Sequence, residues 1–383
     1  MNNKFSLYIH IPFCISKCDY CDFFSIECKK FKIPDDYINA LCRELLYRKK
    51  QFDISKLKTI YVGGGTPSLL TLEQIKTLFN FINNNFTFCD DIEITFETNP
   101  DDITPELLEV LSECKINRLS CGIQSLCDDV LKFIHRRADR IKNLDALNLI
   151  KQKWNGQVSL DVICGLPYET ECSFLEALNQ IIKYNPHHIS MYSLTVEEGT
   201  PLYEKINCGK IKYDYDFSDS LWLKARKLLL KNGYYQYEIS NFCRDDFYSH
   251  HNFTYWSFES YIGIGSGAAS TVYSDKNAVR FTNVKNTEKY INYWLCNEGE
   301  IPEEIERLDE KILEFEFFMM GLRTSRGISS ERFQDFFKRP LPQKFLTVFD
   351  DWKSKNLAEE KDGYFSLNTE GILFLNRFLE EIC

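Results

Sequence analysis

Residues 7–21 read LYIHIPFCISKCDYC, an apolar β-like run that leads directly into three closely spaced cysteines. Cys14, Cys18 and Cys21 have the spacing C-x3-C-x2-C. Thiolate is a soft ligand for iron, and a short loop with this spacing can wrap around one face of an iron-sulfur cube. Because three thiolates leave the fourth iron of a 4Fe-4S cluster without a protein ligand, the pattern predicts a cluster with one iron open for chemistry.

Six short β-rich runs, each followed by a helical pattern, organise the first half of the chain. They lie at residues 7–11, 59–64, 92–98, 118–123, 158–164 and 188–194. The sequence predicts where two of the helices begin, because Thr71 and Gln74 form a capping-box pair and Thr104 precedes Pro105. Strands that alternate with helices predict a parallel sheet, and right-handed crossovers curl such a sheet toward a barrel. We therefore expect an α/β fold, a partial TIM-like barrel of six βα units.

The alternation fades after about residue 200, which divides the chain into three expected segments. They are the βα partial barrel over residues 1–200, a segment that completes the barrel over 201–305, and an α-rich, winged-helix-like C-terminal domain over 306–383. The acidic balance of the chain argues against DNA binding by the last segment, which we interpret as a packing or docking module.

Composition limits the class of protein. The chain has 383 residues, a net charge of −10 and a pI near 5.3, which argues against extended contact with nucleic acid. No apolar run approaches the length of a membrane helix, and no signal-peptide layout is present, so we expect a soluble, cytoplasmic protein. The fifteen cysteines are scattered and odd in number, so most are interpreted as reduced core thiols rather than a disulfide framework.

Residues suited to ligand binding follow the predicted strands. They are Gly63–Pro67 after the second strand, Glu97–Pro100 at the end of the third, Gln124 and Ser125 after the fourth, and Gly165–Pro167 after the fifth. In a parallel barrel these loops open at one end, so they predict one composite site. Glycine lets a ligand lie against bare backbone N–H and C=O groups, although glycine and proline also punctuate ordinary loops.

A structural zinc site is the alternative interpretation of the cysteines. It would use Cys14, Cys18 and Cys21 with His10 as a fourth ligand. The GGGTP run at Gly63–Pro67 favours the cluster, because a structural zinc loop has no need of a backbone surface for a ligand.

The motifs together resemble the radical S-adenosylmethionine (SAM) superfamily. Within it, they resemble the branch that holds anaerobic coproporphyrinogen III oxidase and a group of heme chaperones. The segments that carry the resemblance are YIHIPFCISKCDYCDF, YVGGGTPS, FETNPDD, NRLSCGIQS, LDVICGLP, YSLTVEEGTPLY, YEISNF, HNFTYW, YIGIGSGAAS and FMMGLR. Because they follow in order over nearly the whole chain, the resemblance is specific.

The resemblance implies that the open iron chelates the amino and carboxylate groups of SAM, and that an electron from the cluster can then release a 5′-deoxyadenosyl radical. By position it implies roles for eight residues: Tyr8, Gly64, Gly65 and Thr66 at the methionine end, Glu97 at the ammonium, Arg136 at the carboxylate, and Gln124 and Asp161 at the ribose hydroxyls. These pairings are chemically sensible. For Arg136, a solvated charge beside Arg137 is the alternative.

Two departures distinguish the chain from the oxidases of this branch. Phe23 stands where the oxidases carry a further cysteine, and only thirteen residues precede Cys14. Both departures fit the heme chaperones, as does HNFTYW at residues 251–256. The resemblance places a heme-ligand role on His251, with Tyr255 and Trp256 as flanking aromatics. A structural hydrogen bond by His251 is the alternative, and the neighbouring His250 is a rival ligand.

The leading interpretation is a cytoplasmic heme chaperone that holds heme and a 4Fe-4S cluster with SAM. Its expected partners are a heme-accepting protein and an electron donor of the flavodoxin or ferredoxin kind, with no nucleic acid and no integral membrane segment. The second interpretation is an oxygen-independent coproporphyrinogen III oxidase that decarboxylates propionates. A third is a general iron-sulfur electron-transfer protein, which three cysteines favour least.

Overall fold

A computed structural model describes residues 4–28, 32–296 and 299–382. Its centre is a twelve-stranded sheet. In spatial order the strands are β14 (Glu303–Leu308), β13 (Asn277–Asn283), β12 (Ala269–Ser274), β11 (Tyr261–Ile264), β1 (Lys4–Ile11), β4 (Lys56–Gly64), β5 (Thr87–Thr98), β6 (Arg118–Gln124), β7 (Gln157–Cys164), β8 (His188–Ser193), β10 (Asn241–Cys243) and β9 (Tyr235–Gln236).

The six predicted strands are confirmed, and they form the parallel middle of the sheet. β1, β4, β5, β6, β7 and β8 each pair in parallel with the next. The register sets Glu97 beside Ser120, and Gly122 beside Asp161. Because the carboxyl ends of parallel strands meet at one edge, this register brings the predicted site residues together. The predicted α/β architecture, with six parallel strands that alternate with helices, is confirmed.

Antiparallel strands extend the sheet at both edges. On one side β11 pairs in parallel with β1, and β12, β13 and β14 follow as an antiparallel meander. On the other side β10 pairs antiparallel to β8, and β9 pairs antiparallel to β10. The sequence did not predict the meander, because β14 is mostly exposed and polar and lacks the apolar alternation that marks a strand.

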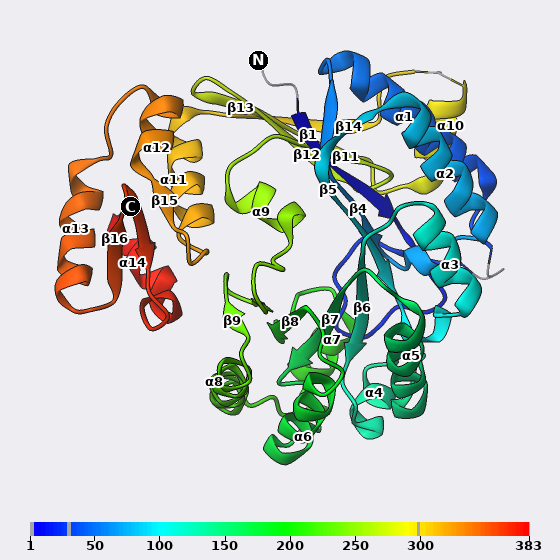
Figure 1. Cartoon of the computed structure of the whole chain (residues 1–383), viewed down its shortest axis with the longest axis horizontal. Helices are drawn as coiled ribbons and strands as arrows, with labels where there is room; N and C mark the ends of the chain where they lie inside the picture. The colour runs from blue at the N-terminus through cyan, green and yellow to red at the C-terminus, as the bar shows by residue number, and fades with distance from the viewer. Residues whose placement is uncertain (1–3, 29–31, 297–298, 383) are drawn as a thin grey trace.

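Helices connect the strands and pack beside the sheet. They are α1 (Asp35–Gln51), α2 (Leu72–Asn85), α3 (Pro105–Glu113), α4 (Asp128–Phe133), α5 (Arg140–Lys153), α6 (Glu171–Ile182), α7 (Pro201–Asn207), α8 (Tyr215–Lys231) and α10 (Thr287–Cys296). The predicted caps are confirmed, since Thr71 and Gln74 form a capping box and Thr104 accepts from the backbone of Leu107. In Figure 1 α9 (His250–Trp256) lies on the inner side, between the sheet and the C-terminal segment.

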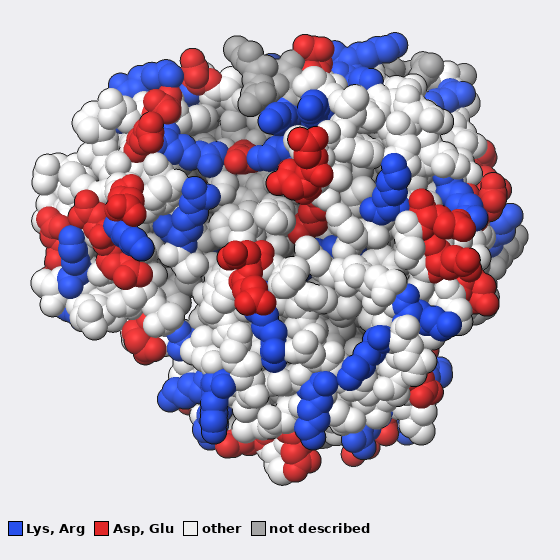
Figure 2. Space-filling view, viewed as in Figure 1, with Lys and Arg blue, Asp and Glu red and all other residues white. Residues whose placement is uncertain are grey.

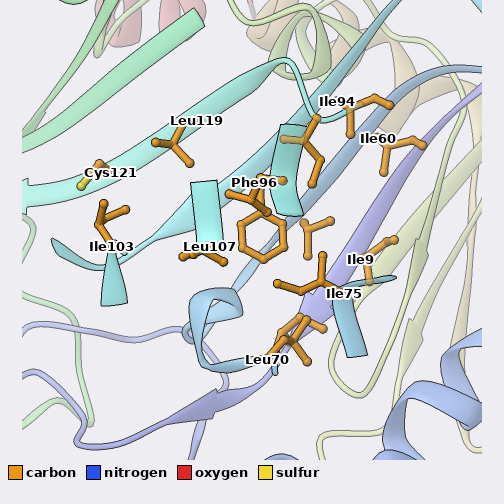
Figure 3. Packing of buried hydrophobic residues seen from close by; sticks show 14 of the residues in the cluster. Ile9, Ile60, Leu70, Ile75, Ile94, Phe96, Ile103, Leu107, Leu119 and Cys121 are labelled. Atoms are coloured by element: carbon orange, nitrogen blue, oxygen red, sulfur yellow. The ribbon is translucent and has the colours of Figure 1, made fainter. Parts of the chain in front are cut away.

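Packing between strands and outer helices forms the main core. Figure 3 shows Ile9, Ile60 and Phe96 from three neighbouring strands together with Ile75 of α2 and Leu107 of α3. All five side chains are buried. Since burial of each such side chain contributes about 1.5–3 kcal/mol, this layer fixes the strand ends that carry the site.

The C-terminal segment has a core of its own. Its elements are α11 (Glu310–Gly321), β15 (Ile328–Ser329), α12 (Ser330–Phe337), α13 (Gln343–Ser354), β16 (Ala358–Lys361), β17 (Tyr364–Leu367) and α14 (Leu375–Ile382). Aromatic rings fill this core, and Phe333, Phe345 and Phe349 are almost fully buried. Phe258, from the segment before it, packs into the same cluster.

Two general surface properties bear on function. In the part of the chain that the structure describes, no helix combines the length and hydropathy needed to cross a bilayer. Figure 2 shows acidic and basic side chains interspersed over one face, without a continuous basic band on that face.

Candidate functional site

A cavity of about 410 Å³ opens at the carboxyl ends of the parallel strands. It is lined by the three predicted cluster cysteines and by seven of the eight residues predicted for SAM. Those ten residues are Cys14, Cys18, Cys21, Gly64, Gly65, Thr66, Glu97, Gln124, Arg136 and Asp161. The fold thus brings residues from six separate loops and strands to one place.

The cysteines belong to the loop between the short strands β2 (Phe13–Cys14) and β3 (Ile26–Glu27). None of the three forms a disulfide, and Thr66 Oγ1 lies 3.5 Å from Cys14 Sγ. Burial raises the pKa of the Cys14 thiol and raises that of Cys21 to about 11. Both thiols therefore keep their protons unless a positive charge lies close by, and iron is such a charge.

Asp19, in the middle of this loop, ties the loop to two helices. Its side chain is buried, and it accepts hydrogen bonds from His135 Nδ1 at 2.8 Å and from Lys205 Nζ. Its backbone N–H donates to the Ile134 carbonyl at 3.2 Å, and its carbonyl accepts from Leu202 N–H at 2.9 Å. The cysteine loop is therefore held by residues that follow α4 and by residues of α7.

Replacing Asp19 by alanine is expected to lower the affinity of the cysteine loop for iron. Groups that orient metal ligands typically contribute a factor of about 10–100 in metal affinity, so we expect Asp19→Ala to lose iron about tenfold faster to a chelator under anaerobic conditions. Glu27→Ala, an exposed change in β3 directly after this loop, is the matched control. Equal rates of iron loss from Asp19→Ala and wild type would contradict the anchoring role.

The GGGTP loop lies flat against the chain that leads into the cysteines. Gly65 N–H donates to the Ile11 carbonyl at 2.8 Å, and a Cβ at Gly65 would stand 2.8 Å from the Phe13 carbonyl oxygen. Gly64 has φ +113°, and a Cβ there would stand 2.5 Å from His10 Nδ1. Only glycine fits both positions, and the loop can therefore offer its other, bare face to a ligand.

Arg136 faces the cavity, whereas its neighbour Arg137 pairs with Asp102 at 2.6 Å. Arg136 Nη2 donates to Asn99 Oδ1 at 2.9 Å, and Nη1 lies 3.8 Å from Cys18 Sγ. Its buried Nε has no hydrogen-bond partner among the described residues. A guanidinium with a spare donor inside a cavity is suited to a carboxylate.

Glu97 and Asp161 are two buried acidic groups in the wall of the cavity. Glu97 accepts from Tyr61 OH at 2.6 Å and from Gly64 N–H at 3.2 Å, and Asp161 accepts from Ser120 Oγ at 2.9 Å. Burial, with the Asp161 charge adding to it, raises the pKa of Glu97 to about 7. Burial also raises the pKa of Asp161. Both carboxyl groups would be stabilised as anions by a bound cation.

Gln124 holds its place through strained backbone. Its φ is +63°, an uncommon value for a residue with a side chain, and the β6–β7 register shifts between Gly122 and Gln124. A Cβ at Gly122 would stand 2.7 Å from Gln124 Nε2 and 3.5 Å from Arg136 Nη2. Glycine at 122 therefore leaves room for both polar side chains, and strain of this kind is common at binding sites.

Tyr8 is the one predicted SAM residue that does not line the cavity. Tyr8 OH bonds His10 Nδ1 at 2.9 Å, and His10 Nε2 bonds the Phe24 carbonyl at 2.9 Å. Since His10 lies directly under Gly64, Tyr8 can support the glycine loop only from one layer below. Both nitrogens of His10 are occupied, so His10 is not available as a zinc ligand in this fold. Within the described residues, no three His, Cys, Asp or Glu side chains are arranged to hold a single metal ion.

His251 is also outside the cavity, inside the lower part of the barrel. It is 1% exposed, and its ring lies between Thr59 Oγ1, 2.7 Å from Nδ1, and Tyr255 OH, 2.8 Å from Nε2. The backbone N–H groups of His250 and His251 donate to the Glu93 carboxylate at 3.0 and 2.9 Å. In this structure the start of HNFTYW fastens α9 to strands β4 and β5.

Acid is expected to destabilise the fold through His251. Burial lowers the pKa of the His251 imidazole to about 3. Because the unfolded ring gains a proton near its ordinary pKa whereas the native ring stays neutral, protons favour the unfolded chain. The free energy of unfolding should therefore fall by up to about 1.4 kcal/mol per pH unit below about pH 6.5. Urea unfolding at pH 6.5 and 5.5 measures this slope. His251→Gln should reduce this slope, to which the buried rings of His10 and His188, whose pKa values burial also lowers, contribute as well. An unchanged slope in His251→Gln would refute the assignment.

Sequence reasoning missed several residues that the cavity contains. Asn99 orients Arg136, and Tyr192, Thr195 and Glu197 form part of the wall. These residues belong to the runs FETNPDD and YSLTVEEGTPLY, which also carry the family resemblance. Only the register shows that these runs reach the same cavity.

The donor set fits a 4Fe-4S cluster together with SAM. Three thiols would hold three irons, the bare backbone of Gly64 and Gly65 gives a flat surface, and the unpartnered Nε of Arg136 and the carboxyl of Glu97 match a carboxylate and an ammonium.

Comparisons with known proteins agree with this arrangement. The profile described as Radical SAM superfamily matches residues 8–181, and the profile described as HemN C-terminal domain matches residues 308–374. The chain is 34% identical to the heme chaperone HemW of Bacillus subtilis, over 97% of each chain. It is 35% identical to the heme chaperone HemW of Haemophilus influenzae, over 98% of this chain and 97% of that one. Among solved structures, coproporphyrinogen III oxidase (HemN) from Escherichia coli matches with a TM-score of 0.81 and 22% identity, over 99% of this chain and 90% of that one, which shows a shared fold.

Proposed function

Because the chain belongs to the HemW family of the radical SAM superfamily, we propose that it is a heme chaperone, which binds heme and a 4Fe-4S cluster with SAM and passes the heme to an acceptor protein. The observation that carries this proposal is the similarity to heme chaperones over 97% of the chain. The acceptor, an electron donor of the flavodoxin or ferredoxin kind, and a cytoplasmic location belong to the same proposal.

The cavity residues have assigned roles in this proposal. Cys14, Cys18 and Cys21 hold the cluster. Arg136 binds the carboxylate of SAM, and Glu97 binds its ammonium group. When bound, the cluster and SAM supply one-electron reduction of a sulfonium.

The remaining assigned contacts concern the rest of SAM. Gly64, Gly65 and Thr66 lie along the methionine end, and Gln124 and Asp161 bind the ribose hydroxyls. Tyr8 acts through His10 and not by direct contact, which is consistent with its hydrogen bond to that ring.

An oxygen-independent coproporphyrinogen III oxidase is the second candidate function. The shared fold with HemN favours it. Against it stands Phe23, which lines the cavity with 62% of its surface exposed, at the position where the oxidases of this branch have a further cysteine.

Two measurements on the anaerobically reconstituted, full-length protein separate the candidates. A heme chaperone should bind hemin in a saturable titration and should not convert coproporphyrinogen III. Turnover of coproporphyrinogen III with stoichiometric release of 5′-deoxyadenosine would favour the oxidase instead. Hemin binding no tighter than that of a non-heme control protein would refute the chaperone proposal.

A further inference from the structure

A buried histidine lies one layer below the cluster cavity. His188 is the first residue of β8, is 1% exposed and does not line the cavity. Strand register sets it beside Ser159 of β7, two residues before Asp161, which does line the cavity. Because side chains two residues apart on a strand face the same side, Ser159 lies between the imidazole and a carboxyl group predicted to bind SAM.

Four hydrogen bonds in series connect Asp161 with the residue that precedes α9. Ser159 Oγ donates to Asp161 Oδ1 at 3.4 Å and lies 2.8 Å from His188 Nδ1. His188 Nε2 lies 2.8 Å from Tyr237 OH, and the backbone N–H of Ser249 donates to the same phenol oxygen at 3.2 Å. The four residues that lead to Asp161 are each no more than 1% exposed, so these bonds are shielded from water.

The direction of these bonds follows from what each group can donate. Burial, with the Arg118 charge adding to it, lowers the pKa of His188 well below its usual value, so the ring is neutral and carries one N–H. A backbone N–H can only donate, so Tyr237 OH accepts from Ser249 and keeps its own hydrogen for His188 Nε2. The ring proton is then on Nδ1 and is donated to Ser159. In the other tautomer the phenol hydrogen would have no acceptor among the described residues.

This tautomer leaves the Ser159 hydrogen for Asp161, so that each carboxyl oxygen has a donor. Ser120 Oγ donates to Oδ2 at 2.9 Å, and Ser159 Oγ donates to Oδ1. Two donors fix the rotation of the carboxylate and leave it further lone pairs for the hydroxyl groups of a ligand. Burial already raises the pKa of Asp161, and loss of the Ser159 donor would favour the protonated form, which accepts fewer hydrogen bonds.

We infer that His188 is a positioning residue for SAM, which holds Ser159 as a donor and thereby orients the Asp161 carboxylate toward the ribose hydroxyls. The inference rests on the proposed binding of SAM through Asp161. It adds a residue that affects the ligand without touching it.

SAM titrations of the anaerobically reconstituted, full-length protein test this role, with the EPR signal of the cluster as the readout. His188→Leu removes both ring hydrogen bonds and should bind SAM about tenfold more weakly, as expected when a hydrogen bond to an ionised group is lost. His188→Asn places an amide N–H near the position of Nδ1 and should recover most of the affinity. Tyr237→Phe should weaken binding in the same direction, because it no longer fixes the tautomer.

Tyr234→Phe is the matched control for Tyr237→Phe. It also removes a buried phenol group, but this one donates to the Pro186 carbonyl at 2.8 Å and has no bond to the series that ends at Asp161. The control should bind SAM as wild type does. If circular dichroism shows that His188→Leu does not fold, the comparison of these two tyrosine variants decides the test, and equal affinities in both would overturn the inference.

Two further comparisons separate positioning from packing. Because His188 acts through Ser159, the double variant Ser159→Ala with His188→Leu should bind SAM no more weakly than Ser159→Ala alone. Methionine has the amino and carboxylate groups of SAM but no ribose, so its binding to the cluster should be the same in His188→Leu as in wild type. Additive losses in the double variant, or an equal loss of methionine binding, would show a general packing effect and overturn the inference.

The outcomes also distinguish this inference from the proposed function. If His188→Leu binds SAM as wild type does, or if His188→Asn recovers nothing, His188 has no positioning role, although the proposed binding of SAM stands. If the wild-type protein shows no SAM-dependent change in its EPR signal, the proposed binding of SAM fails and the inference fails with it.

Discussion

Cys18→Ala leaves the anaerobically reconstituted protein without its 4Fe-4S cluster. Cys18 lies 3.8 Å from Arg136 Nη1 at the wall of the cavity, and no other described cysteine shares that wall besides Cys14 and Cys21. A cube held by two thiolates has two irons exposed to water and to chelators. We expect iron and sulfide contents near zero and loss of the absorption near 400 nm that such clusters give. SAM binding should fall with the cluster, because the open iron is its anchor.

Cys28→Ala is the matched control for this change. Cys28 belongs to the same stretch of chain, and its Sγ donates to the Lys32 carbonyl at 3.2 Å, away from the cavity. The control should retain a full complement of iron and a SAM-dependent change in its EPR signal. A cluster in Cys18→Ala with wild-type iron content, or zinc in the wild-type protein, would refute the assignment of the three ligands.

SAM binding should depend on pH through Glu97. The pKa of this carboxyl is raised to about 7, chiefly by burial, and the ammonium of SAM requires the carboxylate form. Above pH 7 the carboxylate is already present. Below pH 7 a proton must leave when SAM binds, so affinity decreases as the pH falls. We expect the dissociation constant of SAM to rise about tenfold between pH 8 and pH 6.

The variant Glu97→Gln distinguishes the ionisation of Glu97 from that of other groups in the cavity. The amide keeps the shape and cannot ionise, so affinity at pH 8 should fall about ten- to a hundredfold, the contribution of a hydrogen bond to a charged group. Its pH dependence should also disappear. Glu109→Gln, on the exposed face of α3, should behave as wild type. If Glu97→Gln keeps the tenfold change with pH, Asp161 or another group is responsible instead.

Local patterns in the sequence were enough to predict the six parallel strands and the loop that carries the three cysteines. Each of the six parallel strands is a short apolar run bounded by turn residues. Its assignment as a β-strand therefore depends only on residues close to it in the chain. The cysteine spacing is likewise a local property. The meander of β12, β13 and β14 was not predicted, and its edge strand β14 buries only one residue and so carries little apolar pattern.

The two histidines of α9 show what the local sequence does not predict, namely which of two neighbouring rings is exposed. The resemblance pointed to His251 as a heme ligand, with His250 as a rival. Which ring is available depends on Thr59, nearly two hundred residues earlier in the chain, and on how α9 sits against β4 and β5. A one-residue step along a helix turns a side chain by about 100°, so neighbours in sequence can face a core and the solvent.

The sequence by itself determined the α/β class, the three cysteines and the order of the loops that carry ligand-binding residues, because these depend on periodicity and spacing along the chain. Only the tertiary structure decided that ten of those residues share one cavity, that Tyr8 and His10 lie beneath it, and that His251 is buried while His250 is exposed. The physical reason is that burial, hydrogen-bond partners and pKa depend on contacts between segments far apart in the chain, and strand register sets those contacts.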